Sequence, residues 1–233
     1  MNSVKKDNET LINFWNQELT LTEESKEELK QFSDSDWKQI VPSGKLFDAV
    51  KGLANKKKIL DYGCGSGWAS IVASRSGAND VTAVDVIKDG IDAVKLYADA
   101  FKANFKTLYI EPDWLSKQPS ETYDGIVCSN VLDVIPLETS KEIIKELARV
   151  ATSDADIIIG LNFYFDEEVA KKHDMHFEDG HRLYIKGILR LVNLTDQEWK
   201  DLFSPYFNIV KFEYFAWHGE LKETRRLFYL KKK

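Results

Sequence analysis

The sequence has few cysteines and no long apolar stretch. Cys64 and Cys128 are its only two cysteines, and both fall inside short apolar segments, which argues against a framework of disulfides. No run of apolar residues approaches the roughly 18 that a membrane-spanning helix needs, and the first residues lack the apolar core of a signal peptide. These absences predict a protein that has no membrane partner and works in the reducing cytoplasm.

The chain also lacks an excess of positive charge. Its 32 lysines and arginines are outnumbered by 38 aspartates and glutamates, and the formal net charge is -6. This balance argues against a broad face for nucleic acid, although it leaves room for a local basic patch. With 43% hydrophobic and 30% charged residues over 233 positions, the composition predicts one sizeable α/β domain with an appendage.

The most informative stretch runs from Lys58 to Trp68 and reads KILDYGCGSGW. It begins with an apolar run typical of a buried parallel strand, continues with Gly63, Gly65 and Gly67, and ends in a helical pattern. A strand, a glycine turn and a helix in this order form a nucleotide site, because backbone without side chains lets a ligand approach closely. The dinucleotide fingerprint G-x-G-x-x-G would need glycine at position 68, where this chain has tryptophan.

At these residues the chain resembles the class I S-adenosylmethionine-dependent methyltransferases. Their first motif places an acidic residue two positions before G-x-G-x-G, and the run from Asp61 to Gly67 fits it. The resemblance implies a Rossmann-like, mostly parallel seven-stranded sheet with helices on both faces and antiparallel pairing at its C-terminal end. It also implies S-adenosyl-L-methionine as the cofactor. It covers residues 56–162 well and residues 195–231 in outline.

The hydrophobic pattern favours the same α/β class. From residue 56 onward, short apolar strands alternate with helical patterns, which predicts a parallel sheet covered on both faces. Residues 1–55 read as helices without a core of their own, so we expect an N-terminal helical cap on a methyltransferase domain at 56–233. The alternation breaks at 163–194, an insert that reads as either a hairpin or an extended arm. Strands are expected near residues 59–62, 81–85, 107–110, 123–129, 156–161, 207–217 and 224–230.

Several residues are expected around the cofactor. Asp85 ends the second strand, where a carboxylate can accept hydrogen bonds from both hydroxyls of a ribose. The resemblance places Asp61 at the methionine end, where an ammonium group needs a carboxylate. Asp113 follows the third strand, where the family reads the adenine, although Glu111 competes for this role. The set expected at the cofactor is Asp61, Gly63, Cys64, Gly65, Gly67, Asp85, Val86, Asp113, Trp114, Ser129 and Asn130.

The acceptor side is marked less sharply. Amino-group and nucleobase N-methyltransferases often carry Asn/Asp-Pro-Pro-Tyr/Phe after the fourth strand, whereas this chain reads SNVL at 129–132, which argues against that subclass. The residues that follow resemble those of small-molecule methyltransferases. Ligands of open α/β sheets bind beyond the carboxyl ends of the strands. We therefore expect the insert 163–194 to be an acceptor-side lid, with Phe14, Trp15 and Tyr184 as candidate acceptor contacts.

Histidines and carboxylates gather in the insert. Their arrangement suggests a metal site, but no cysteine is near and the spacing matches no closed metal motif, so we expect no metal. A polar lid that faces the acceptor and a plain solvated loop both remain open. A base is needed only if the acceptor must lose a proton. The candidate bases are Asp133, His173, His176, Glu178 and His181.

The sequence thus predicts transfer of a methyl group from S-adenosylmethionine, with a small molecule as the favoured acceptor. One alternative is a methyltransferase that acts on protein or RNA, which a basic rim and an open cleft would favour. Another is a module that binds S-adenosylmethionine without catalysis. Asp85 and the complete glycine turn argue against that second alternative.

Overall fold

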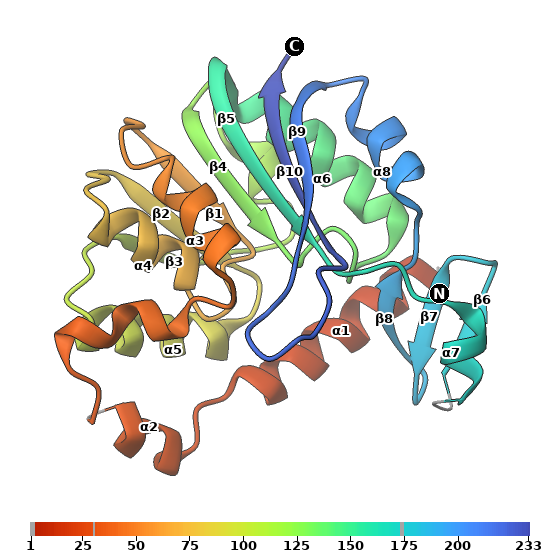
Figure 1. Cartoon of the computed structure of the whole chain (residues 1–233), viewed down its shortest axis with the longest axis horizontal. Helices are drawn as coiled ribbons and strands as arrows, with labels where there is room; N and C mark the ends of the chain where they lie inside the picture. The colour runs from red at the N-terminus through yellow and green to blue at the C-terminus, as the bar shows by residue number, and fades with distance from the viewer. Residues whose placement is uncertain (1–2, 30, 173–174) are drawn as a thin grey trace.

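The large sheet has seven strands. The computed structural model describes residues 3–29, 31–172 and 175–233, and within them the strand order is β3-β2-β1-β4-β5-β10-β9 (Figure 1). The parallel strands are β1 (Ile59–Tyr62), β2 (Val81–Asp85), β3 (Lys106–Tyr109), β4 (Tyr123–Ser129) and β5 (Ala151–Leu161). β10 (Arg225–Lys232) is antiparallel to β5, and β9 (Phe207–Phe215) is antiparallel to β10. This sheet confirms the predicted fold class.

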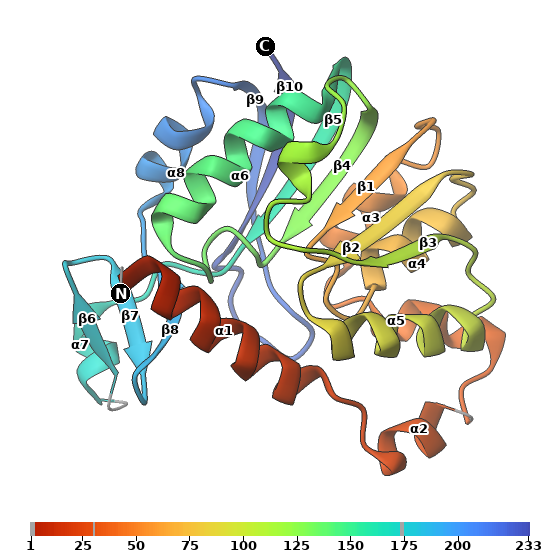
Figure 2. The ribbon, with the colours of Figure 1, turned by 180° about the vertical axis from the view of Figure 1, so that it is seen from behind.

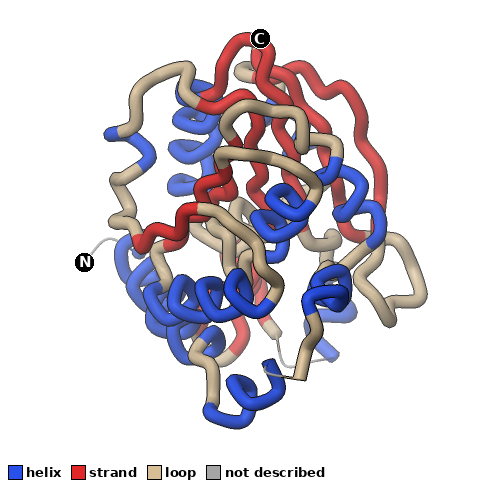
Figure 3. Tube along the Cα trace, turned by 90° about the vertical axis from the view of Figure 1, so that its left-hand side faces the viewer, coloured by secondary structure: helices blue, strands red, loops and turns tan. Residues whose placement is uncertain are grey.

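Helices cover both faces of the sheet (Figure 3). Strand β5 shows why, because successive side chains of a strand point to opposite faces. Ile157 and Ile159 pack in the core under α6 (Leu137–Val150) and α8 (Asp196–Phe203), while Ile158 packs with α3 (Gly44–Lys51) and α4 (Trp68–Arg75). A strand that is buried on both faces reads as a continuous apolar run, as the sequence does here.

The order of the strands places a crevice at one edge. β1 pairs with β2 on one side and with β4 on the other, so the chain reverses its direction of progress between β1 and β4. Ligands of open α/β sheets bind at such a switch point, beyond the carboxyl ends of the strands. The glycine turn follows β1 at this edge and leads into α4, and α5 (Lys88–Ala100) follows β2.

The N-terminal helices pack in two different places. Helix α3 belongs to the body of the domain, because Leu46 and Val50 are buried against Val72 of α4. Helix α1 (Ser3–Leu19) instead lies across the carboxyl edge of the strands, from α5 at one end to the insert at the other (Figures 1 and 2). Between them are α2 (Glu23–Leu29) and the 3-10 helix η1 (Asp34–Ile40).

The insert forms a small unit of its own beside α1 (Figure 2). It contains α7 (Glu167–Lys172) and an antiparallel sheet of β6 (His176–Glu178), β7 (Arg182–Ile185) and β8 (Ile188–Val192). Of the two shapes left open for this segment, β7 and β8 form the hairpin. Among the described residues, no helix combines the length and apolar character that crossing a bilayer requires.

Candidate active site

A cavity of about 980 Å³ lies at the carboxyl ends of the parallel strands, beneath α1. The glycine turn, the ends of β2 and β4, the loop after β3, one side of α6 and one side of α1 form its walls. Pockets for single small ligands span roughly 300–1,000 Å³. The cavity therefore has room for a nucleotide-sized cofactor together with a small second ligand.

The three glycines of the turn are required for different reasons. All three have positive φ, at 69° for Gly63, 52° for Gly65 and 76° for Gly67. A Cβ on Gly63 would lie 2.3 Å from a methyl group of Val131, and one on Gly67 would lie 2.7 Å from Val94. These two glycines therefore allow close packing. Gly65 lines the cavity and a Cβ there would meet no heavy atom within 4 Å, so a side chain would project into open space.

Asp61 brings a buried carboxylate to the cavity wall. It lies in β1, is 3% exposed, and its Oδ2 accepts hydrogen bonds from the backbone N (3.1 Å) and Oγ (2.7 Å) of Ser70 in α4. Burial outweighs these two hydrogen bonds and raises the pKa of Asp61 to about 6. No cation among the described residues forms an ion pair with Asp61, so a cationic ligand would supply the positive partner for its ionised form.

Asp85 ties the glycine turn to the end of β2. Its Oδ2 accepts from the backbone N of Gly65 at 2.9 Å, and its Oδ1 accepts from the backbone N of Ile87 at 3.0 Å. Burial raises the pKa of this carboxyl as well, although the two N–H donors oppose the shift. Asp61 and Asp85 line one cavity from neighbouring strands. Its chemistry thus suits a ligand with a positive charge and hydroxyl donors, as S-adenosylmethionine has.

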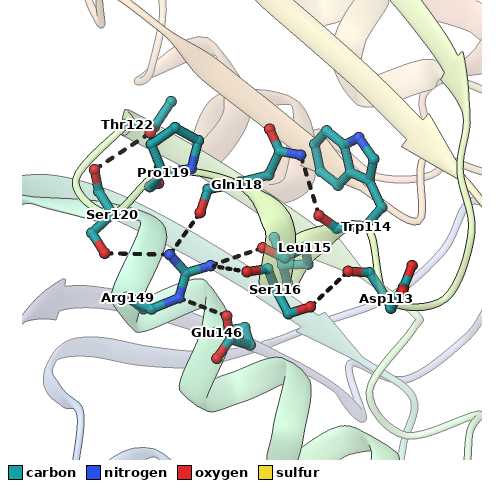
Figure 4. A network of polar contacts seen from close by, with 10 residues as sticks. All are labelled: Asp113, Trp114, Leu115, Ser116, Gln118, Pro119, Ser120, Thr122, Glu146 and Arg149. Carbon is teal, nitrogen blue, oxygen red and sulfur yellow. Dashed lines mark hydrogen bonds and ion pairs between the residues drawn. The ribbon is translucent and has the colours of Figure 1, made fainter.

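Arg149 of α6 holds the loop after β3 in place (Figure 4). Its Nη2 donates to the carbonyl of Leu115 at 2.9 Å, and its Nη1 donates to the carbonyl of Gln118 at 2.7 Å. Its Nε donates to Glu146, one turn earlier in α6, at 2.6 Å. Because one rigid guanidinium bonds several carbonyls of the loop, the loop keeps a fixed distance from α6.

The same loop carries the two residues expected at the adenine. Asp113 lines the cavity, but its carboxylate is largely exposed and forms an ion pair of 2.7 Å with Lys117. Trp114 packs its ring against the main core and is not among the described residues that line the cavity. Glu111, the competitor of Asp113, is likewise absent from that described lining, so the geometry favours Asp113.

Ser129 and Asn130 reach the cavity from the end of β4, and their contact with the cofactor stays a prediction. Asn130 has a φ of 57°, and its Nδ2 donates to Oδ1 of Asn162, the residue after β5, at 2.8 Å. The Oγ of Ser129 donates to Oδ1 of Asn130 at 3.2 Å. Of the remaining expected cofactor residues, Cys64 and Val86 line the cavity, whereas Gly67 acts one residue away as the N-cap of α4.

The three candidate acceptor contacts lie in different surroundings. Trp15 lines the cavity, whereas the ring of Phe14 faces the insert, with the guanidinium carbon of Arg190 4.3 Å from its centroid. Tyr184 donates from its hydroxyl to Oδ2 of Asp7 in α1 at 3.0 Å. No described residue of 163–194 lines the cavity, so the insert contacts α1 rather than the cavity itself. Its role as an acceptor lid stays a prediction.

Four of the five candidate bases are described, and these four lie away from the cavity. Asp133 is fully buried, with Oδ2 accepting from the backbone N of Asn162 at 2.6 Å. His176 stacks on Tyr184 on the surface of the insert, with ring centroids 5.6 Å apart. His173 lies outside the described residues. The described lining of the cavity contains neither Asp133 nor the insert candidates His176, Glu178 and His181.

The described residues contain no group of three or more histidine, cysteine, aspartate or glutamate side chains arranged to hold a metal ion. The catalytic roles of the candidate bases stay predictions, because none of the described candidates lines the cavity. The described residues that line the cavity are therefore suited to hold the cofactor, whereas the described candidate bases are not placed there.

Sequence reasoning missed Trp217, which lines the cavity from the loop after β9. A signal for it existed in the topology. β9 is antiparallel to β10, which is antiparallel to β5, so the carboxyl end of β9 lies at the same edge as those of the parallel strands. A tryptophan two residues beyond that end is a candidate cavity wall for the same positional reason as Asn130.

Comparisons with known proteins agree with this geometry. A family model described as "Methyltransferase domain" matches residues 59–154. The ribosomal protein L11 methyltransferase of Shewanella baltica (strain OS185) is 32% identical over 142 residues, which cover 55% of this chain and 45% of that protein. The ubiquinone biosynthesis O-methyltransferase of Glaesserella parasuis serovar 5 (strain SH0165) is 28% identical over 181 residues, which cover 69% of this chain and 73% of that protein.

A solved structure shows the same fold. The 1,6-didemethyltoxoflavin-N1-methyltransferase of Burkholderia thailandensis, with bound 1,6-didemethyltoxoflavin and S-adenosylhomocysteine, gives a TM-score of 0.65 at 13% identity and covers 84% of this chain and 80% of that chain. The chain spans less than half the length of the L11 methyltransferases that it matches. The matched residues 59–154 include the glycine turn and both strand-end carboxylates. Residues 59–154 are therefore a methyltransferase domain by their family model, and the fold around them is the one expected for the class I S-adenosylmethionine-dependent methyltransferases.

Proposed function

We propose that this protein transfers a methyl group from S-adenosylmethionine to a small-molecule acceptor in the cytoplasm. The observation that carries the proposal is one covered cavity in which Asp61, Asp85 and the open face of Gly65 meet. Two buried carboxylates beside a glycine turn suit the ammonium and ribose ends of the cofactor. The two free cysteines, Cys64 and Cys128, are buried and fit a reducing compartment.

Each part of the cavity has a distinct task in holding the cofactor. Asp85 would accept hydrogen bonds from the ribose hydroxyls, and Asp61 would face the ammonium group of the methionine end. Gly65 leaves the space in which the ligand meets backbone rather than a side chain. Asp113, on the loop that Arg149 fixes, would lie toward the adenine. When bound, S-adenosylmethionine supplies a methyl group on a positively charged sulfur.

The reaction asks mainly for alignment. In an in-line displacement from a sulfonium, the positive charge disperses as the transition state forms, so the protein must position the reactants and exclude water. Helix α1 covers the cavity, and Trp15 and Trp217 line it from α1 and from the loop after β9. These aromatic walls would keep water from the reacting atoms and would leave the acceptor an apolar surface to lie against.

The covered cavity favours a small acceptor over a macromolecule. Helix α1 is attached to the insert by Arg190 over Phe14 and by Tyr184 to Asp7, so a protein or RNA chain would have to displace it. The net charge of -6 does not favour RNA either. The relative named for ubiquinone biosynthesis matches over 73% of its length, whereas the L11 relative matches over 45% of its length.

A labelling experiment tests the proposal. A cell extract is divided by ultrafiltration into small molecules and macromolecules, and each fraction receives the protein and S-adenosylmethionine labelled in its methyl group. We expect label in the small-molecule fraction, lost with Asp85→Ala and kept with Asp80→Ala. Asp80 is a matched control because it lies just before the opposite end of β2, is half-buried, and is not among the described residues that line the cavity.

Three outcomes separate the alternatives. Label in the macromolecular fraction alone would contradict a small acceptor and would favour protein or RNA. Binding of S-adenosylhomocysteine without label in either fraction would favour a module without catalysis. Equal labelling by the parent and a folded Asp85→Ala variant would remove Asp85 from the cofactor site.

A further inference from the structure

Arg225 is a buried arginine at the start of β10, at the same sheet edge as the cavity. It is 5% exposed, and its Nε and Nη2 donate to the carboxylate of Glu220 at 2.7–3.0 Å. Its guanidinium carbon lies 3.3 Å from the ring centroid of Trp217, which lines the cavity. A paired and stacked guanidinium has little freedom to move, so Arg225 fixes this aromatic wall.

The third nitrogen of Arg225, Nη1, determines how a neighbouring amide must point. Its Nη1 donates to the side-chain oxygen of Asn162. An arginine has only donors, so Asn162 must present Oδ1 to it rather than its amide nitrogen. Asn130 donates from Nδ2 to the same Oδ1 at 2.8 Å. Two donors now occupy the two lone pairs of one carbonyl oxygen, and the arrangement has no equivalent with either amide reversed.

The orientation of Asn130 follows from that of Asn162. Because Nδ2 of Asn130 is turned toward Asn162, its Oδ1 lies on the other side, next to the hydroxyl of Ser129 at 3.2 Å. Ser129 and Asn130 line the cavity, whereas Asn162 is not among the described lining residues. The oxygen of Asn130 therefore points away from Asn162 and toward Ser129, a residue of the cavity wall, and it has one lone pair still to fill.

We propose that Arg225 is a positioning residue that, through Asn162, turns the side-chain oxygen of Asn130 toward the acceptor. A carbonyl oxygen recognises a hydrogen-bond donor, so the site selects acceptors whose nucleophilic atom carries hydrogen, namely an amine N–H or a hydroxyl O–H. The inference about the acceptor rests on the proposed methyl transfer. The orientation of the amides does not, because it follows from Arg225, Asn162 and Asn130 alone.

Two matched pairs of variants test the network. Arg225→Met and Asn162→Leu keep approximate size but remove the donor and the acceptor, respectively. Arg225→Lys restores a donor, and Asn162→Asp restores an oxygen that accepts from both neighbours. In protein labelled with ¹⁵N-asparagine, we expect one side-chain amide signal with slow hydrogen exchange, assigned to Asn130 by its absence in Asn130→Asp. It should be lost in the first variant of each pair and regained in the second.

Transfer and cofactor binding are measured on the same variants. With the labelled small-molecule fraction as substrate, we expect transfer to fall about tenfold or more in Arg225→Met and Asn162→Leu, and to recover in the two restoring variants, as loss of one buried hydrogen-bond network predicts. Affinity for S-adenosylhomocysteine should stay within about threefold of the parent in all four, because neither Arg225 nor Asn162 is among the described residues that line the cavity. The methylated product should carry its methyl group on nitrogen or on oxygen.

The outcomes are separable. An amide signal that survives Arg225→Met, or a product methylated on carbon or sulfur, would overturn the inference. Restoring variants as impaired as the disrupting ones would reduce the network to a structural role and would also overturn it. A parent protein that transfers no methyl group to any fraction would contradict the proposed function, while the amide signal would still decide the orientation of Asn130.

Discussion

The ionised carboxylate of Asp61 should lower the free energy of unfolding and strengthen cofactor binding. Asp61→Asn should therefore stabilise the protein and weaken cofactor binding. The pKa of Asp61 is about 6 in the folded protein against an ordinary 3.8. The folded state therefore holds this proton more tightly than the unfolded state does. As pH rises from about 4 to about 6, the contribution of Asp61 to the free energy of unfolding falls, and the penalty is complete above pH 6.

The size of the effect follows from the pKa difference. At about 1.4 kcal/mol per pKa unit, the penalty at neutral pH is about 3 kcal/mol. Asparagine resembles the protonated acid and can still accept from Ser70, so Asp61→Asn should gain up to about 3 kcal/mol at pH 7.5 and almost nothing at pH 4. For a domain of this size the gain corresponds to a melting temperature higher by up to roughly 6–12 °C.

Cofactor affinity should change in the opposite direction. Loss of a charged partner for the ammonium group should weaken binding of S-adenosylhomocysteine by about 10–100-fold at pH 7.5. In the parent, affinity should rise with pH up to about 6 as Asp61 ionises, and the variant should lack that part of the rise. Asp85 is present in both proteins, so the difference between the two titrations isolates Asp61. Calorimetry and thermal melts from pH 4 to pH 8 measure both quantities. Equal affinities, or equal melting temperatures at pH 7.5, would refute the reasoning.

Three further changes have defined outcomes. Gly65→Val should abolish cofactor binding because its side chain enters the cavity. Gly77→Val, also at a positive φ but outside the described lining, should lower stability and leave binding intact. Arg149→Met should free the loop after β3 and lower stability by about 1–3 kcal/mol, as thermal melts would show. It should also lower cofactor affinity, measured by calorimetry, because this loop would lie toward the adenine. Replacing residues 166–182 by a short Gly/Ser linker should leave cofactor affinity within a few-fold and abolish most labelled transfer if the insert is a lid.

Each of these changes has a result that would contradict it. Normal binding by a folded Gly65→Val variant would make the glycine turn purely structural. Unaltered affinity in Arg149→Met would separate the loop from the cofactor. Full transfer after replacement of 166–182 would show that the insert is a surface excursion.

The body of the sheet was predictable because its signals are local. The apolar run that includes Ile157 and Ile158 indicates a strand buried on both faces, and the spacing of the glycines after β1 indicates the turn. The predicted strand at 156–161 begins at Ala151 instead, because Ala151 also pairs with Tyr123 of β4, across an irregularity that separates this pair from the regular pairing that starts at Gly125 and Asp156. Such an extension depends on a partner strand and leaves no mark in the local pattern.

The site was predictable only where chain order fixes position. Asp61 lies next to the carboxyl end of β1 and Asp85 ends the neighbouring β2, so their meeting at one edge follows from the alternation of strands and helices. Tyr184 and Phe14 carry apolar rings that suit a pocket equally well, but their partners, Asp7 and Arg190, decide their direction. Those partners are far apart in sequence, and composition alone cannot pair them.

Titration of Asp85→Ala tests most directly that this cavity holds S-adenosylmethionine. The parent and the variant, both checked for folding by circular dichroism and thermal melting, are titrated calorimetrically with S-adenosylmethionine and S-adenosylhomocysteine. We predict one site per chain in the parent. Loss of the carboxylate removes hydrogen bonds to a charged acceptor, worth about 1.5–3 kcal/mol, so the variant should bind about 10–150-fold more weakly. A parent that binds neither compound, or a folded variant that binds as tightly as the parent, would contradict the assignment of the site.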